Sequence, residues 1–225
     1  MNFLQITTTA VPEVPLATEQ PSMSLLELLF QGGWVMVPIL LLSLVAVFVI
    51  IERFLNLNRA SKIKKGLLET IKEHIKRGDL SIAETTVAQY DTPVSAILLK
   101  GIKRMGSPVK EIESAMESTG RVEMMKLEKN MSYLGVIAAI APMLGFVGTI
   151  SGVIKIFYNI SLADNISIGL IAGGLYEKMI TSAAGLVVGI IAHTGYQLLN
   201  MKIESIGMEM EKAGVEFIDI ITEHK

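Results

Sequence analysis

The sequence predicts an all-α polytopic membrane protein with three transmembrane helices, the second and third of which are long and extend into a cytoplasmic helical bundle. Hydrophobic residues make up 51% of the 225 residues although only 6% are aromatic, which is high for a soluble domain. Three long apolar runs are separated by polar stretches. Most charged residues lie between and after these runs rather than inside them.

The first 21 residues are rich in proline, show no helical periodicity and are interpreted as a flexible external extension. A docking segment for an envelope partner is the alternative. Residues 22–51 are expected to form an interfacial helix followed by the first transmembrane helix, whose apolar run covers Val35–Ile51. A cleaved signal peptide is rejected, because residues 1–34 contain no Lys or Arg and the run begins far from the amino terminus.

Residues 52–132 are expected to form a cytoplasmic helical region. None of the 20 Lys and Arg precedes the first span or lies in residues 158–167. Because basic residues stay on the cytoplasmic side, residues 52–132 are placed inside and the amino terminus outside. Nothing from Val109 to Tyr133 is expected to stop a helix, so this helix is predicted to run straight into the second span.

The second and third spans are assigned to residues 133–157 and 168–199, joined by an external turn at residues 158–167. Residues 200–225 are expected to continue the third span as a cytoplasmic helix, because they carry one apolar stripe at helical spacing. The stripe consists of Ile203, Ile206, Met210, Ala213, Phe217 and Ile220.

Polar residues interrupt the second and third spans at a depth where they are costly without partners or water. We therefore predict an ion pathway lined by Thr149, Glu177, Thr181 and Ser182. Thr149 and Glu177 are expected at comparable depth on antiparallel helices, which would form a polar layer. Alternatives remain open for both kinds of residue. Glu177 could form an ion pair with Lys178 or Lys155, or could simply be exposed at the membrane interface. The hydroxyls could donate hydrogen bonds to carbonyls of the preceding helical turn.

Small residues are frequent in the same two spans, which lets helix backbones approach closely. Pro142 is expected to bend the second span and to free one carbonyl that a hydroxyl or water could satisfy. The positions assigned to close packing are Gly145, Gly148, Gly152, Gly185 and Gly189.

The sequence contains no signature of an enzyme. The absence of Cys excludes disulfides, thiolate nucleophiles and Cys-based metal sites. No Walker loop, HExxH, GxSxG or GxGxxG after a strand is present, so no catalytic residue, cofactor or metal site is assigned and ATP is not the expected energy source. No nucleic-acid partner is expected either, although the formal net charge of -2 says nothing about nucleic acid by itself, because the charges are segregated along the chain.

Three segments together resemble the ExbB/TolQ/MotA family of ion-driven motor subunits, and its ExbB branch in particular. They are APMLGFVGTISG at residues 141–152, GLYE at 174–177 and TSAAGLV at 181–187. The resemblance extends over roughly residues 24–210. One departure is that the family's usual Thr–Thr pair is Thr181–Ser182 here, and another is Lys178, where the family commonly has a small apolar residue.

The resemblance implies a homopentamer in the bacterial inner membrane, with a periplasmic amino terminus and a cytoplasmic carboxyl terminus. The pentamer would surround the single transmembrane helices of an ExbD-like dimer, with Thr149 and Ser182 facing the partner and Glu177 in the same layer. Proton flow would drive motion that TonB passes to outer-membrane transporters. A TolQ-like subunit of the Tol-Pal system is the alternative within the family, and a partner-independent ion channel or membrane scaffold is the alternative outside it. The choice between proton and sodium stays open.

Overall fold

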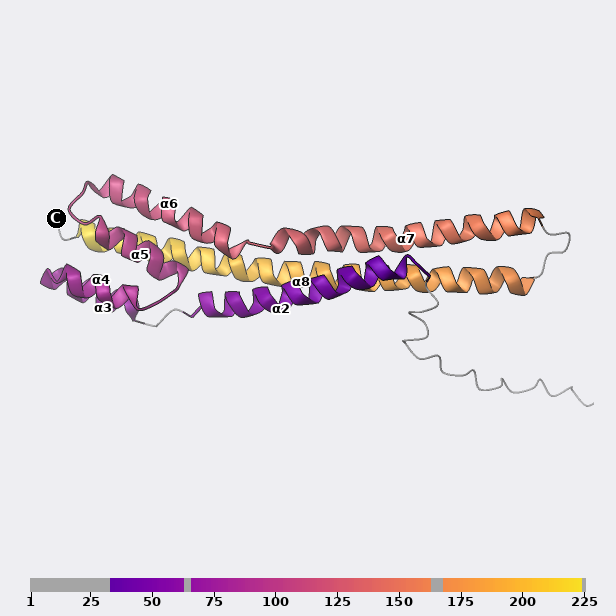
Figure 1. The fold of residues 1–225 in the computed structure, drawn as a ribbon. Coiled ribbons are helices and arrows are strands. Elements are labelled where there is room, and N and C mark those ends of the chain that lie inside the picture. The colour runs from indigo at the N-terminus through magenta and orange to yellow at the C-terminus, as the bar shows by residue number, and fades with distance from the viewer. Residues whose placement is uncertain (1–32, 63–65, 163–167, 224–225) are drawn as a thin grey trace, which may run out of the picture.

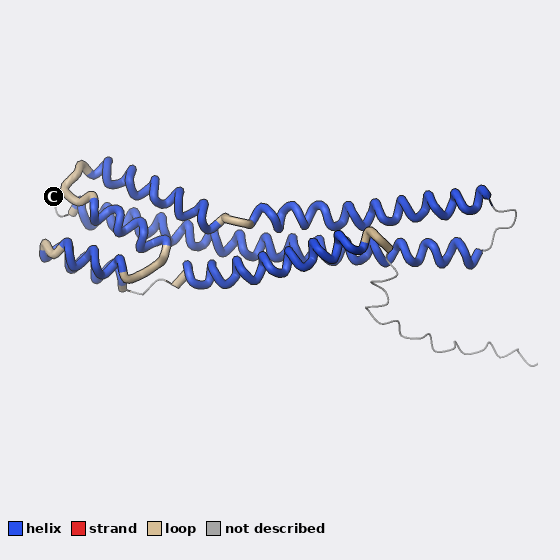
Figure 2. The backbone as a smooth tube through the Cα atoms, in the orientation of Figure 1, coloured by secondary structure: helices blue, strands red, loops and turns tan. Residues whose placement is uncertain are grey.

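In the computed structural model, residues 33–62, 66–162 and 168–223 are described, and they form seven helices and no strand. Figure 1 shows an elongated molecule in which α2, α7 and α8 run lengthwise, while α3 to α6 gather around the carboxyl-terminal part of α8. Figure 2 shows how short the loops are that join the neighbouring helices at this end. The helices are α2 (Met36–Ala60), α3 (Leu67–Arg77), α4 (Leu80–Ala88), α5 (Pro93–Lys103), α6 (Val109–Leu127), α7 (Met131–Leu162) and α8 (Ile168–Thr222).

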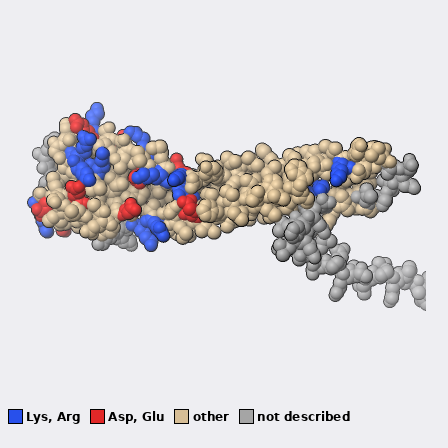
Figure 3. All heavy atoms as spheres, viewed as in Figure 1, with Lys and Arg blue, Asp and Glu red and all other residues tan. Residues whose placement is uncertain are grey.

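Within the part of the chain that the structure describes, three helical stretches are long and apolar enough to cross a membrane. They are Met36–Ala60, Met131–Leu162 and Ile171–Thr222, whose most apolar windows have mean hydropathies of 2.4, 2.0 and 1.4. They coincide with most of each of the three apolar runs of the sequence, so the predicted all-α fold with three spans is confirmed. Figure 3 shows the charged residues gathered around α3 to α6, whereas the surface over α7 is largely uncharged in this view.

Several expected segments lie outside the described residues. They are the extension at residues 1–21, the interfacial helix that was expected to begin at residue 22, and residues 163–167 of the external turn. The described part of that turn is helical, because α7 continues to Leu162 instead of ending at residue 157. Within this last turn of α7, the Ser161 hydroxyl donates to the carbonyl of Tyr158 at 2.7 Å.

The third span continues without interruption into the tail, as predicted. Helix α8 has 55 residues and is therefore about 82 Å long, far more than the roughly 30 Å of a bilayer core. All six residues of the apolar stripe from Ile203 to Ile220 are buried, with exposed fractions of 3% or less. We call α3 to α6 together with the part of α8 after residue 200 the helical bundle. Its core forms around this stripe.

The expectation of one continuous helix into the second span is wrong. Helix α6 ends at Leu127 and α7 begins at Met131. Between them Asn130 adopts a φ of 66°, a left-handed conformation that Asn tolerates better than most residues. The buried Arg53 lies at this break, where its Nη1 donates weakly to the carbonyls of Lys126 and Leu127 at 3.4 and 3.5 Å. A cation beside the last carbonyls of α6 favours ending the helix there.

Helix α5 joins the bundle through a close contact at Gly101. Thr92 caps this helix, because its Oγ1 accepts from the Ser95 N–H at 3.3 Å and its own N–H donates to Ser95 Oγ at 3.1 Å. A Cβ on Gly101 would overlap the ring of Phe217 and would lie 2.7 Å from Met116 Sδ. Phe217 is fully buried, so its ring has little room to move.

The variant Gly101→Ala is expected to lower the free energy of unfolding by about 1–3 kcal/mol through overpacking. Thermal unfolding of the detergent-purified protein measures the effect. Gly120→Ala is the matched control, because a Cβ there would meet only Ile97 and Met210, at 3.7 and 3.8 Å. The control should keep or slightly raise the unfolding temperature, since Ala is favoured over Gly in helices. Equal destabilisation by both variants would contradict the proposed clash.

Candidate functional site

The backbones of α7 and α8 meet at two buried glycines, Gly145 and Gly185. A Cβ on Gly185 would lie 2.5 Å from the carbonyl oxygen of Ala141 and 3.1 Å from Gly145 Cα. A Cβ on Gly145 would lie 3.0 Å from Ser182 Cα. Because these neighbours are backbone atoms that cannot turn aside, only glycine allows the two helices to approach this closely.

Gly189 provides the space that Pro142 requires inside α7. A Cβ on Gly189 would lie 2.5 Å from Pro142 Cγ and 3.2 Å from the carbonyl oxygen of Ala138. Pro142 has no N–H to donate to Ala138, so this carbonyl is the one that the proline frees. The freed carbonyl therefore faces the glycine of α8.

Two further glycines of α7 receive side chains of α8. A Cβ on Gly148 would lie 3.1 Å from Thr181 Cγ2 and 3.4 Å from Cγ1 of Val35, which directly precedes α2. A Cβ on Gly152 would overlap the aliphatic stem of Lys178. No sequence pattern indicates that Val35 belongs to this contact, because Val35 is simply the first residue of an apolar run. The start of the first span thus lies beside Thr181.

Three hydroxyl residues lie at one level of the α7–α8 pair. Thr149 is half-buried, and its Oγ1 donates to the carbonyl of Phe146 at 2.7 Å. This is the bond to the preceding turn that was the alternative for the hydroxyls, and it leaves the Thr149 oxygen able to accept. Thr181 is fully buried, and Ser182 is half-buried with its backbone against Gly145. We call Thr149, Thr181 and Ser182 the hydroxyl layer.

The helix register places Glu177 about one turn away from this layer. Gly148 lies against Thr181 and Gly152 lies against Lys178, so Thr149 is level with Thr181. Glu177 is four residues before Thr181, about 6 Å along the axis of α8 and nearer to the 163–167 connection. The side chain of Glu177 lies outside the described residues. Thr149 and Glu177, which were expected at comparable depth, are therefore offset by about one helical turn.

The hydroxyl layer can exchange hydrogen bonds, but its groups do not titrate in the physiological range. Each hydroxyl is both a donor and an acceptor, so it can pass hydrogen bonds along a polar path. Exposed apolar side chains surround the layer on both helices, including Phe146, Val147 and Leu186. No group of three or more His, Cys, Asp and Glu that could hold a metal ion occurs among the described residues.

This fold and site define a polytopic membrane protein whose second and third spans form a glycine-packed pair with a layer of hydroxyls. The sequence model of the MotA/TolQ/ExbB proton channel family matches residues 89–212, which include α5, α6, α7 and most of α8. The match covers more than half of the chain. The chain belongs to this family, whose members are transporter and channel subunits rather than enzymes.

Curated relatives carry the names of two branches of the family. A biopolymer transport protein ExbB homologue from Methanothermobacter thermautotrophicus is 28% identical over 182 residues, covering 80% of this chain and 64% of the relative. ExbB from Neisseria meningitidis serogroup A is 26% identical over 194 residues, covering 78% of this chain and 87% of the relative. The Tol-Pal system protein TolQ from Haemophilus influenzae is 27% identical over 113 residues, half of each chain. The chain thus spans just under two thirds of the first of these relatives.

Proposed function

We propose that this chain is the proton-conducting motor subunit of an ExbB–ExbD type complex in the bacterial inner membrane. Five copies would surround the transmembrane helices of an ExbD-like single-span dimer, and TonB would carry the work to outer-membrane transporters. The observation that carries the proposal is the hydroxyl layer, which lies where glycines bring α7 and α8 together. Membership of a proton channel family and the relatives named ExbB support it.

The energetics agree with a motor that needs a partner. Moving one charge through a membrane potential supplies about 2.3 kcal/mol per 100 mV, so a few protons can bias a conformational equilibrium by several kcal/mol. The chain itself offers hydroxyls and, within residues 131–162 and 168–199, Glu177 as the single acidic residue. A partner that contributes a second carboxyl inside the membrane would complete the proton path.

The distribution of basic residues supports a periplasmic amino terminus and a cytoplasmic carboxyl terminus. Lys and Arg begin at Arg53, directly after the first apolar run, and none lies in residues 158–167. The helical bundle carries most of the charged residues and is therefore assigned to the cytoplasm (Figure 3). Proteoliposomes with a protease added outside would test this orientation.

A TolQ-like role in the Tol-Pal system is the second candidate, and the similarity to TolQ of Haemophilus influenzae favours it. It would use the same hydroxyl layer, so the neighbouring genes decide between the two candidates. Genes for an ExbD and TonB pair would support the ExbB role, and genes for a TolR and TolA pair would support the TolQ role.

A partner-independent channel or scaffold is tested by the purified chain in a planar bilayer. Conductance without a partner would support that channel instead.

The variant Thr149→Val is expected to slow growth on chelated iron while the oligomer stays intact. Valine keeps the shape of threonine but removes the hydroxyl, so one hydrogen-bonding step of the layer is lost. A loss of about 1 kcal/mol corresponds to roughly fivefold slower iron uptake. Uptake is measured in cells whose only copy is the variant, with membrane level and native oligomer size determined in parallel.

Thr149→Ser is the matched control, because serine retains the hydroxyl and should keep uptake near the wild-type rate. Equal uptake by Thr149→Val and wild type would remove Thr149 from the proton path. Normal uptake in a strain that lacks the gene would instead redirect the assignment to the TolQ-like or partner-independent role.

A further inference from the structure

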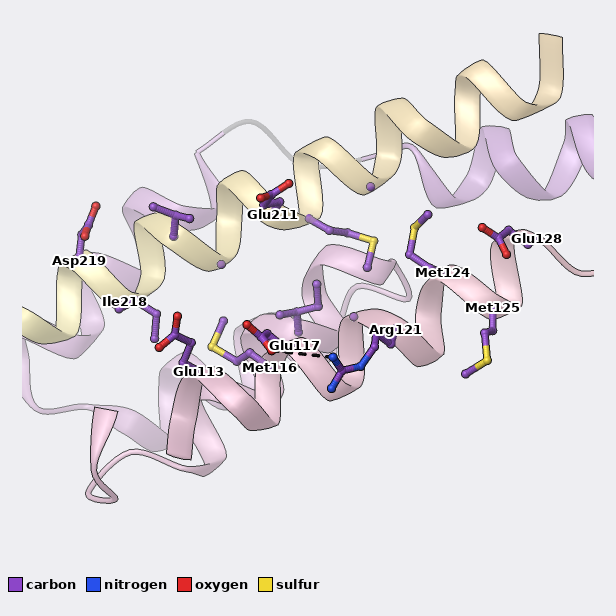
Figure 4. A pocket seen from close by; sticks show the side chains of 16 residues that line it. Glu113, Met116, Glu117, Arg121, Met124, Met125, Glu128, Glu211, Ile218 and Asp219 are labelled. Atoms are coloured by element: carbon purple, nitrogen blue, oxygen red, sulfur yellow. Dashed lines mark ion pairs between the residues drawn. The ribbon is translucent and has the colours of Figure 1, made fainter. Parts of the chain in front are cut away.

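A groove of about 920 Å³ lies between α6 and α8 in the helical bundle (Figure 4). Methionines such as Met116, Met124 and Met210 give it an apolar, adaptable lining. Among the described residues that line it, Arg121 is the only basic one, and it pairs with Glu117 at 3.9 Å, so the groove as a whole is acidic. Its other acidic lining residues are Glu113, Glu128, Glu211 and Asp219.

A second hollow lies on another side of α6, between α6 and α5, and has the opposite charge. Lys100 of α5 and Arg104, which directly follows α5, line it together with Lys110 of α6, and Glu111 is the only acidic residue of its described lining. Val122 adds an apolar side chain that is 44% exposed. We call this hollow the basic face, and the groove between α6 and α8 the acidic groove.

The two surfaces lie at the same level of the molecule but point in different directions. In α6 and its two flanking residues, the lining of the acidic groove runs from residue 113 to 128 and that of the basic face from 108 to 122, so the two surfaces overlap along the helix axis. At 3.6 residues per turn, the two sets of α6 residues point about 130° apart. One chain therefore presents an acidic surface to one side and a basic surface to another.

The membrane restricts which surfaces of two copies can meet. Copies arranged around an axis perpendicular to the membrane keep each residue at a constant height, so a surface can contact only surfaces at its own level. A contact between two different faces repeats from copy to copy and closes into a ring when the rotation between copies is a whole fraction of a full turn. The acidic groove and the basic face satisfy both conditions and attract each other electrostatically.

We propose that the acidic groove of one copy packs against the basic face of the next copy, which makes a head-to-tail contact between neighbouring subunits. This inference rests on the homo-oligomer of the proposed function. Exposed apolar side chains border the groove outside the apolar spans: Met125 and Val215 line it with exposed fractions of 63% and 58%, and Met208 on the adjoining face of α8 is 64% exposed. A neighbouring subunit would cover them, as exposed apolar patches commonly require.

Cross-linking between cysteines tests this contact cleanly, because the chain has no Cys of its own. Two differently tagged copies are co-expressed in cells, one with Ser118→Cys in the basic face and one with Glu211→Cys in the acidic groove. Treatment of membranes with a short bis-maleimide should join the two tags. Either variant expressed alone should give no dimer, whereas a single chain carrying both substitutions should give a ladder that ends at the full ring.

The matched control replaces Glu211→Cys by Lys76→Cys and should give no cross-link. Lys76 is an exposed position on α3 outside both surfaces.

Charge reversal supplies the second measurement. Lys110→Glu in the copy with Ser118→Cys should lower the yield about fivefold, and Glu117→Lys in the other copy should restore it. Lys76→Glu should leave the yield unchanged.

The opposing results are distinct. An intact oligomer without the 118–211 cross-link would overturn this contact and leave the proposed homo-oligomer standing, with the acidic groove open to a basic partner. A dimer from Ser118→Cys alone would also overturn it, since it would mean that like faces meet. Absence of any oligomer in native mass spectrometry would reject the contact and the homo-oligomer together.

Discussion

The variant Gly185→Val is expected to remove almost all assembled protein from the membrane. The first side-chain atom on Gly185 would lie 2.5 Å from the carbonyl oxygen of Ala141 and 3.1 Å from Gly145 Cα. Both are backbone atoms, so α7 and α8 would have to move apart along their contact. Transmembrane helices associate largely through close van der Waals packing, so this separation would also loosen the contacts at Gly148 and Gly189.

The experiment compares membrane level and native oligomer size for Gly185→Val, Gly185→Ala and Gly173→Ala. Gly185→Ala should lose part of the oligomer, because a methyl group is the smallest addition that meets the Ala141 carbonyl. Gly173→Ala is the matched control on the same helix, since a Cβ there would meet no atom of the described residues within 4 Å. A normal oligomer from Gly185→Val would show that the two helices can separate without loss of assembly.

The sequence was sufficient to predict the three spans and the long last helix. Apolar runs that exceed the thickness of a bilayer leave little choice of structure, because only a helix satisfies its own backbone there. The continuation of α8 was predictable for a related reason: the stripe from Ile203 to Ile220 keeps helical spacing and is buried against the bundle.

The break before α7 and the helix register were not predictable in the same way. Asn130 interrupts the chain between α6 and α7 by adopting a φ of 66°, yet no Gly or Pro occurs at this break to predict it. Periodicity shows which residues share a face, but it does not fix how far one helix is shifted along another. That shift depends on contacts such as Gly152 with Lys178 and on the extension of α7 to Leu162.

The packing of α6 against α8 explains why the acidic groove could not be derived from sequence. Glu113 and Glu117 read as ordinary solvated positions of a cytoplasmic helix. Their significance comes from Glu211 and Asp219, which lie about a hundred residues further along the chain and line the same groove. Only the folded bundle brings these carboxylates together around methionines.

The variant Glu177→Gln is expected to abolish energised transport while leaving the oligomer intact. Glutamine keeps the size of the side chain and its ability to hydrogen bond, but it cannot bind and release a proton. Loss of a proton-transfer group typically reduces a rate by about a hundredfold or more. Uptake of chelated iron is measured with membrane level and native oligomer size determined in parallel.

An ion pair with a neighbouring lysine is the competing explanation for Glu177, and lysine variants separate the two. Lys178→Met retains an unbranched stem that can lie across Gly152, and Lys155→Met removes the other lysine that is a candidate partner of Glu177. If Glu177 carries protons, both lysine variants should keep most of the uptake that Glu177→Gln loses. If either lysine variant loses uptake as completely as Glu177→Gln, or if Glu177→Gln loses the oligomer, the carboxylate acts as a structural partner. A carboxylate inside an apolar span is costly to keep, so a proton-carrying role gives the stronger physical reason for its presence.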